Sequence, residues 1–204
     1  MAKEKIKIVI PTEWKDITIG KYQEYLRVLK SKKKDKQKEE EIIALFCGLS
    51  KEIVNKIKLK DKKELVNKIN LFVNNERNTE LEKRIKFNGK KYGFIPNLSK
   101  ITTGEFVDIE EYGKDINKNL HKIMSVLYRE VERESKNFYK IKPYDPSEVD
   151  IEEFKDFPMS TAISSIDFFF RLGTTLLRDL NNSLTENQRK QVREACQVNG
   201  AGTT

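Results

Sequence analysis

The sequence has few of the residues that carry most enzyme and metal chemistry, since its 204 residues include one histidine and two cysteines. Cys47 lies in the apolar run IIALFCGL, which predicts a buried free thiol, argues against a disulfide framework and indicates a cytosolic origin. A histidine-dependent triad would have to use His121, which stands at helical spacing in NLHKIMSVLYR. Because Cys47, Cys196 and His121 supply no zinc motif, we expect no metal site.

The motifs of phosphate binding and of serine hydrolases are also missing. Neither G-x-x-x-x-G-K-[ST] nor a G-x-G-x-x-G after a strand occurs, and no G-x-S-x-G accompanies the histidine. The carboxylates of GEFVDIEEY (Glu105, Asp108, Glu110 and Glu111) fall early in a predicted helix. There they favour the helix dipole and solvent exposure over a paired acid/base role. We therefore expect a protein that is not an enzyme and that takes no cofactor.

Long apolar runs are absent, whereas charge is abundant. No stretch approaches about 18 uncharged apolar residues, so we expect no membrane partner. Charged residues make up 35% of the chain, with a net charge of +8. Residues 1–100 hold 26 Lys and Arg against 14 Asp and Glu, while residues 101–204 hold 14 against 18. This polarity suits nucleic-acid binding, and equally a head-to-tail attraction between copies of the chain.

Helical spacing of apolar residues dominates the first half. We expect a first helix from a Thr18 cap to about Leu29 and a second that carries Ile42 and Phe46 and ends at Gly48. A third should be capped by Ser50 and contain Ile57, and a fourth should begin at a capping box of Asp61 and Glu64 and contain Val73. Residues 30–38 read as a polar, basic connector, and KIKIVI at residues 5–10 alternates as a strand does.

The segment RIKFNGKKYGFIP, residues 84–96, is the clearest β signal. Asn88-Gly89 suits a type I′ turn, because both turn positions need positive φ. The predicted register places an aromatic face on one side, made of Ile85, Phe87, Tyr92 and Phe94. An isolated hairpin is marginal in water, so this face must pack on helices.

After the hairpin the patterns are again helical. We expect helices from a Thr102–Glu105 capping box to Tyr112, over 115–134, over 159–180 and from Thr185 onward, with a proline-broken loop over 139–150. The predicted fold class is mainly α, a helical bundle-like body with one small β-hairpin at about 84–95 and a short N-terminal strand. Within one compact domain we distinguish a basic helical region (1–80), the hairpin (81–100), a C-terminal helical region (101–196) and a polar tail (197–204).

The helix expected over 159–180 is apolar over a wide arc. A heptad-like seam contains Ile163, Ile166, Phe170, Gly173, Leu177 and Leu180. Further apolar side chains lie beside this seam, so more than one side of the helix must be covered. A core helix and a helix that meets another subunit both fit the pattern. For the second alternative the predicted interface residues are Phe168, Phe169, Leu172 and Leu176, with Gln197 and Val198 of the tail.

The lysines of the connector support a rival hypothesis. Lys30, Lys32, Lys33, Lys34, Lys36 and Lys38 form a dense run that suits phosphate contacts. No helix-turn-helix, zinc-finger or aromatic RNA-binding pattern accompanies the run. Asp35 interrupts it and three glutamates follow it, as in a solvated linker.

The helical unit over residues 45–73 resembles the tail assembly chaperones of tailed phages. In that pattern a helix ends in a GLS turn, a short helix follows, and a D-x-x-x-L-x-x-x-I-x-F helix closes the unit. The matching segments here are LFCGLS, KEIVNKI and DKKELVNKINLFV, within a stretch of about 35 residues that runs from Glu41 to Val73. Lys51 and the Ile53-Val54 pair depart from a more acidic start of the short helix.

A second resemblance lies downstream. Residues 91–112 and 119–129 look like proteins encoded among the structural genes of tailed phages, and the lysine- and isoleucine-rich style resembles the crAss-like group. The resemblance implies a virion or assembly role, as a neck or tail component, cargo protein or tail assembly chaperone, and it implies no catalytic residue. The expected partners are other phage structural proteins, including copies of the chain, in the virion or in the host cytoplasm during assembly.

Overall fold

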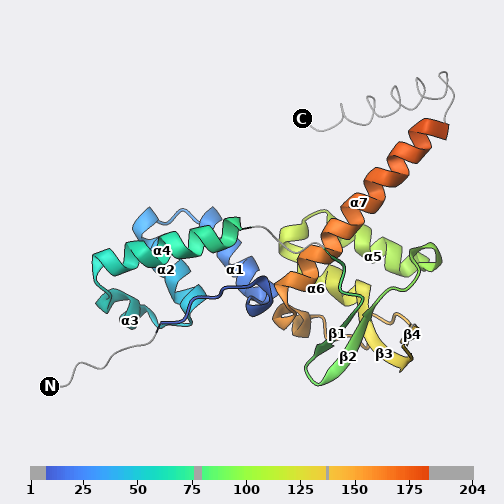
Figure 1. Ribbon diagram of the computed structural model, residues 1–204, viewed down its shortest axis with the longest axis horizontal. Helices are drawn as coiled ribbons and strands as arrows, with labels where there is room; N and C mark the ends of the chain where they lie inside the picture. The colour runs from blue at the N-terminus through green and yellow to red at the C-terminus, as the bar shows by residue number, and fades with distance from the viewer. Residues whose placement is uncertain (1–7, 76–79, 137, 184–204) are drawn as a thin grey trace. The chain divides into compact units, whose positions relative to one another are not determined.

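The computed structural model of this chain describes residues 8–75, 80–136 and 138–183 (Figure 1). In that part it has seven α-helices and one antiparallel sheet of four strands. Contacts divide the chain into a first unit, Met1–Ser165, and a second unit, Ile166–Thr204. Helix α7 (Met159–Ser183) begins in the first unit and continues into the second.

Four helices precede the sheet, and their ends follow the capping residues of the sequence. They are α1 (Ile19–Lys30), α2 (Asp35–Cys47), α3 (Lys51–Lys56) and α4 (Leu59–Asn74). The Thr18 hydroxyl accepts from the Lys21 N–H at 3.2 Å, and Gly48 ends α2 with a φ of 63°. The predicted caps at Thr18, Gly48 and Ser50 are confirmed.

Two predicted boundaries in this region are wrong. Helix α4 begins at Leu59, two residues before the expected Asp61 capping box. Helix α2 begins at Asp35, so half of the expected connector is helical. An aspartate in the first turn complements the helix dipole, which explains why a lysine-rich segment still starts a helix there.

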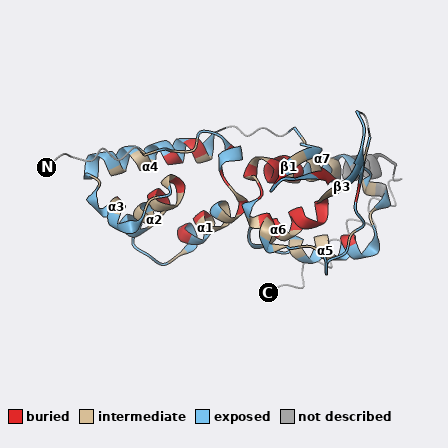
Figure 2. Cartoon of the chain, turned by 90° about the horizontal axis from the view of Figure 1, so that it is seen from below, coloured by how far each residue is buried: buried red, intermediate tan, exposed pale blue. Residues whose placement is uncertain are grey.

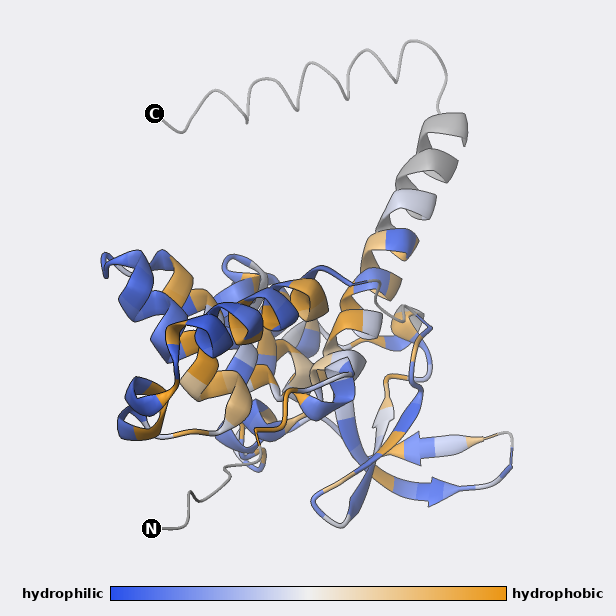
Figure 3. Ribbon diagram, turned by 60° about the vertical axis from the view of Figure 1, so that its left-hand side comes forward, coloured by the Kyte–Doolittle hydropathy of each residue, from blue (hydrophilic) through white to orange (hydrophobic). Residues whose placement is uncertain are grey.

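An aromatic cluster forms the core of these helices. Trp14, from the short 3-10 helix η1 (Trp14–Asp16), lies 5.0 Å from the Phe72 ring of α4. Phe46 of α2 lies 5.4 Å from Tyr25 of α1 and 6.2 Å from Phe72. Figure 3 shows hydrophobic and hydrophilic residues alternating around these helices, as expected when one face of each is buried.

The sheet has the order β1-β2-β3-β4 and is formed by β1 (Arg84–Phe87), β2 (Lys90–Phe94), β3 (Tyr128–Glu134) and β4 (Tyr139–Ile141). Strands β1 and β2 make the predicted hairpin, with Asn88 at a φ of 46° and Gly89 at 74°. Its aromatic face packs as expected, although on a different partner. Phe154 and Phe157, in and after the 3-10 helix η3 (Glu152–Asp156), contact the rings of Phe87 and Tyr92.

The prediction of a mainly α fold with one small hairpin is wrong, because the hairpin is half of a four-stranded sheet and the fold is mixed α/β. The helix expected over 115–134 ends at Leu127 as α6 (Ile116–Leu127), and residues 128–134 become β3. Glu and Arg favour helix in isolation, but β3 pairs with the open edge of β2, where Tyr128 lies opposite Phe94. Tyr128 is fully buried, so tertiary pairing overrides local propensity.

Residues 139–141, expected in a loop, form β4 against β3. Helix α5 (Thr103–Gly113) starts at the predicted Thr102–Glu105 capping box. Of the strand expected over 5–10, residues 5–7 lie outside the described residues, and residues 8–10 are irregular. The expected helix from Thr185 and the polar tail also lie outside the described residues.

A short backbone bridge joins the start of α1 to the start of α7. The N–H of Ile19 donates to the Phe157 carbonyl at 2.9 Å, and the N–H of Met159 donates to the Ile17 carbonyl at 2.8 Å. Ile17, Ile19 and Phe157 are completely buried. The bridge therefore links the helical core to the aromatic face of the sheet. Figure 2 shows that α6 also carries many buried residues.

Replacing Gly93 with alanine should destabilise the first unit. A Cβ at this β2 position would lie 2.6 Å from the Tyr139 ring and 2.9 Å from Ile141, whose strand packs across it. The Tyr139 hydroxyl donates to the Phe94 carbonyl at 2.7 Å, so the ring is not free to move away. We expect the free energy of unfolding in urea to fall by about 1–3 kcal/mol.

Gly104→Ala is the matched control for this substitution. Its Cβ meets nothing within 4 Å, and alanine favours the helix by up to about 1 kcal/mol. Equal destabilisation by both substitutions would contradict the packing explanation.

Candidate functional site

The predicted interface residues of α7 lie in the second unit. Phe168, Phe169 and Leu172 are half-buried, and the Phe168 and Phe169 rings lie 5.9 Å apart. Phe170, expected in the buried seam, is 64% exposed. The Leu176 side chain, Gln197 and Val198 lie outside what the structure describes. Among the described apolar side chains of α7, the exposed one is thus Phe170, which was not among the predicted interface residues.

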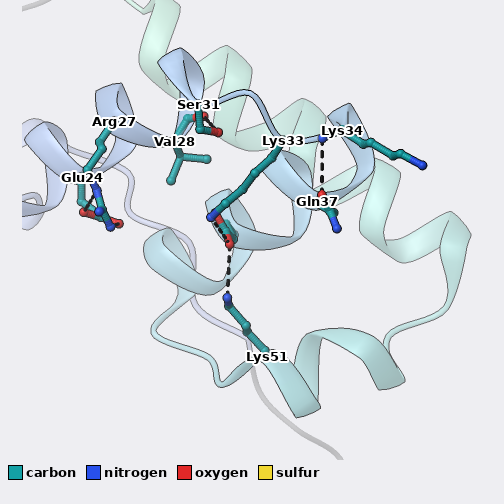
Figure 4. A network of polar contacts seen from close by, with 9 residues as sticks. Glu24, Arg27, Val28, Ser31, Lys33, Lys34, Gln37 and Lys51 are labelled. Atoms are coloured by element: carbon teal, nitrogen blue, oxygen red, sulfur yellow. Dashed lines mark hydrogen bonds and ion pairs between the residues drawn. The ribbon is translucent and has the colours of Figure 1, made fainter.

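The six lysines of the connector do not act as one surface. Lys33 lies 2.7 Å from both carboxylate oxygens of Glu41, and Lys38 donates to the Leu29 carbonyl at 2.9 Å. Glu41 also accepts from Lys51 at 3.2 Å, so one carboxylate joins two lysines, while Lys34 extends away from them (Figure 4). Every lysine of the run except Lys38 is exposed, and the exposed ones other than Lys33 are Lys30, Lys32, Lys34 and Lys36.

The carboxylates of α5 have structural roles rather than a shared site. Glu105 was expected to be exposed, but it is buried and lies 2.7 Å from Arg129 of β3, with 3% and 11% of the two side chains exposed. Its second oxygen accepts from the Thr102 N–H at 2.6 Å, which completes the capping box. Asp108 accepts from the Tyr144 hydroxyl at 2.6 Å.

Burial has the largest effect on the pKa values of Arg129 and Tyr144, which contact the carboxylates of α5. Burial lowers the pKa of Arg129, while the charge of Glu105 opposes that shift. It also raises the pKa of the Tyr144 hydroxyl, and the hydrogen bond to Asp108 adds to the effect. Among the described residues, Arg129 Nε has no hydrogen-bond partner, so the guanidinium depends on Glu105 for compensation.

Glu105→Gln should be strongly destabilising, because it leaves the Arg129 charge buried without a carboxylate. Loss of one partner of such a pair costs about 3–5 kcal/mol, measured as the free energy of unfolding. Glu110→Gln removes an exposed carboxylate from the same helix and should change stability by about 0.5 kcal/mol or less. Similar losses for both variants would show that Glu105 and Arg129 contribute no special interaction.

A groove of about 900 Å³ lies between α1, the start of α6 and η3, all within the first unit. We call it the α1–α6 groove. Basic side chains outnumber acidic ones along it. The bases are Arg27, Lys30, Lys118, Lys122 and Lys155, and the acids are Glu24, Asp115 and Glu152.

His121, the one histidine of the chain, lines this groove and is 5% exposed. Gln23 Nε2 contacts the Asn117 carbonyl at 3.0 Å, the Lys118 carbonyl at 2.8 Å and His121 Nδ1 at 3.2 Å. Because the two carbonyls accept only, the Gln23 amide must present its two N–H groups here, and a proton on Nδ1 would face them, so Nδ1 is the unprotonated nitrogen. The neutral imidazole therefore carries its proton on Nε2, which lies 3.7 Å from Glu152.

Protonation of His121 works against this arrangement. A proton on Nδ1 would face the Gln23 amide N–H groups, and turning that amide would set its oxygen against two carbonyls. Burial lowers the pKa of His121, and Lys155 and Lys122 lower it further, while Glu152 opposes them. The sequence indicated a structural or surface histidine; no local signal revealed its contact with Gln23, which is 98 residues away.

Stability should fall with acidification because of His121. An unfolded chain takes up this proton near the ordinary pKa of about 6.5, but the folded chain resists it. The contribution of the neutral His121 ring to the free energy of unfolding is therefore complete above about pH 6.5. It is lost as the pH falls towards the lowered pKa that His121 has in the folded chain. In His121→Asn, whose amide oxygen takes the place of Nδ1, we expect a weaker loss of unfolding free energy between about pH 7.5 and 5.5. Parallel pH profiles for the two proteins would rule out this role.

The described residues hold no group of three or more His, Cys, Asp or Glu side chains placed to bind a metal ion. Cys47 is a half-buried free thiol, and burial raises its pKa. Of the helices in the described ranges, none has the length and apolar character needed to cross a membrane.

Comparisons of this chain with family models, with curated proteins and with solved structures found no match.

Proposed function

We propose that this chain is a non-catalytic structural or assembly protein of a tailed phage that works through contacts with other proteins. The observation that carries the proposal is the apolar run on α7, where Phe170 is 64% exposed beside the half-buried Phe168, Phe169 and Leu172. An aromatic side chain exposed beside further apolar side chains is costly to leave in water, and aromatic residues are enriched in protein interfaces.

The local structure of residues 45–73 supports the resemblance to tail assembly chaperones. The GLS turn ends α2 with Gly48 in the left-handed conformation, and Ser50 caps α3 by accepting from the Ile53 N–H. Helix α4 follows, although it starts two residues before the aspartate of the family pattern. These are caps and core positions, which support a shared helical unit and carry no functional residue.

Within this proposal the partners are other phage structural proteins, including copies of the chain, and the place of action is the virion or the host cytoplasm during assembly. The two alternatives differ in a measurable way. A virion component is present in purified particles at fixed stoichiometry, whereas a tail assembly chaperone is absent from them.

Nucleic-acid binding by the connector is the rival function. Four lysines of the connector are available for phosphate contacts, because they are exposed and have no carboxylate within 4.0 Å among the described residues: Lys30, Lys32, Lys34 and Lys36. Lys33 and Lys38 are engaged by Glu41 and by a backbone carbonyl. Fewer available charges mean fewer phosphate contacts and a shallower dependence of affinity on salt.

Phe169→Asp should abolish assembly while leaving the helical content unchanged. Removing one buried aromatic contact costs about 1.5–3 kcal/mol, which weakens association by about ten- to a hundredfold. The measurements are light scattering of the purified, nuclease-treated chain and far-ultraviolet circular dichroism. Thr175→Asp places the same charge on an exposed position of α7 and is the control. Unchanged assembly in Phe169→Asp, or equal loss in both variants, would count against the proposal.

A further inference from the structure

Three ammonium groups of the α1–α6 groove take part in no described salt bridge. Lys30, Lys118 and Lys122 each have no carboxylate within 4.0 Å among the residues that the structure describes. Lys30 and Lys118 are exposed, and Lys122 lies over the Tyr112 ring at 5.4 Å. They come from two helices that are far apart in the sequence, so the fold brings these charges together.

The acidic residues of the groove are already occupied. Glu24 lies 2.6 Å from Arg27, and Glu152 lies 2.5 Å from Lys155. Asp115 accepts from the Lys118 N–H at 3.1 Å as the N-cap of α6. The uncompensated charge of the groove is therefore positive, and a ligand must supply the negative partners.

The uncharged part of the lining selects among negative ligands. Leu26 adds an apolar side chain to the groove, and His121 adds a buried ring whose Nε2–H lies on the side of Glu152. A ligand with apolar groups between its charges can cover both. Glu24 and Glu152 interrupt the positive lining, so a uniform polyanion such as a nucleic-acid backbone would place phosphates beside carboxylates, while a polypeptide can place neutral residues opposite them.

We propose that the α1–α6 groove binds an acidic segment of a partner protein, with carboxylates against Lys30, Lys118 and Lys122 and an apolar side chain against Leu26. The proposal rests on the proposed function, because it names the class of partner surface that a protein working through contacts would recognise here. It uses a different part of the chain from the apolar residues of α7.

The test uses the full chain and a fluorescent synthetic peptide of repeated Glu-Leu-Glu-Gly units, with binding followed by anisotropy at low salt. The double variant Lys118→Glu/Lys122→Glu should bind about tenfold more weakly or worse, because two attractive contacts become repulsive. The control, Lys32→Glu/Lys34→Glu, makes the same change of net charge at exposed positions outside the groove and should bind within about threefold of the parent.

His121 supplies a direct reporter of where the peptide binds, because it is the one histidine of the chain. Peptide in the groove should move the proton resonance of the His121 ring and raise its apparent pKa, since added carboxylates favour imidazolium. The proposal is overturned if the peptide does not bind, if both double variants lose affinity equally, or if binding leaves the His121 resonance unmoved. A short DNA duplex that shifts this resonance more strongly than the peptide would overturn it in favour of nucleic acid.

This outcome is separable from failure of the proposed function. Both lysine variants retain the α7 residues, so they should assemble as the parent chain does in light scattering. Loss of peptide binding with assembly intact would remove the groove proposal alone. Peptide binding with no assembly of the parent chain would leave the groove in place and remove the support from α7.

Discussion

The backbone bridge between Ile17–Ile19 and Phe157–Met159 is the constraint on which the first unit depends. Two hydrogen bonds at 2.8 and 2.9 Å would matter little on a surface, but here both partners are buried. They hold the start of α1, which packs in the aromatic cluster of the first four helices, against the start of α7, which follows the aromatic residues packed on the sheet. The Gln23 contacts to α6 and the alignment of η3 with the sheet follow from that placement.

Charge is arranged in this chain at three levels of burial, and the levels have different consequences. The Glu105–Arg129 pair is deep and couples α5 to β3, so it acts on stability. Glu41, which joins Lys33 and Lys51 near the surface, holds the connector against the helices at modest gain. Lys30, Lys118 and Lys122 of the α1–α6 groove have no carboxylate within 4.0 Å among the described residues, so their charges are available to a ligand.

Local signals in the sequence were sufficient for much of the fold. Gly48, Asn88-Gly89 and the Thr18, Ser50 and Thr102 caps act through neighbours within a few residues, so their patterns predicted the turns and helix starts. Strands β3 and β4 could not be predicted in this way. YREVERE has no local reason to be extended, and it becomes a strand because the β2 edge needs a partner. The groove was missed for the same reason, since Gln23 and His121 meet only after folding.

The two sides of the Ile17–Phe157 bridge are about 140 residues apart along the chain. During synthesis, helices α1 to α4 leave the ribosome long before the segment that anchors them. At about 5–20 residues per second the delay is on the order of ten seconds. For that interval the helices have their own aromatic cluster and no attachment to the sheet. The order of translation thus gives the basic half of this protein a period of independent existence, in which its apolar surfaces are open to other chains being made nearby.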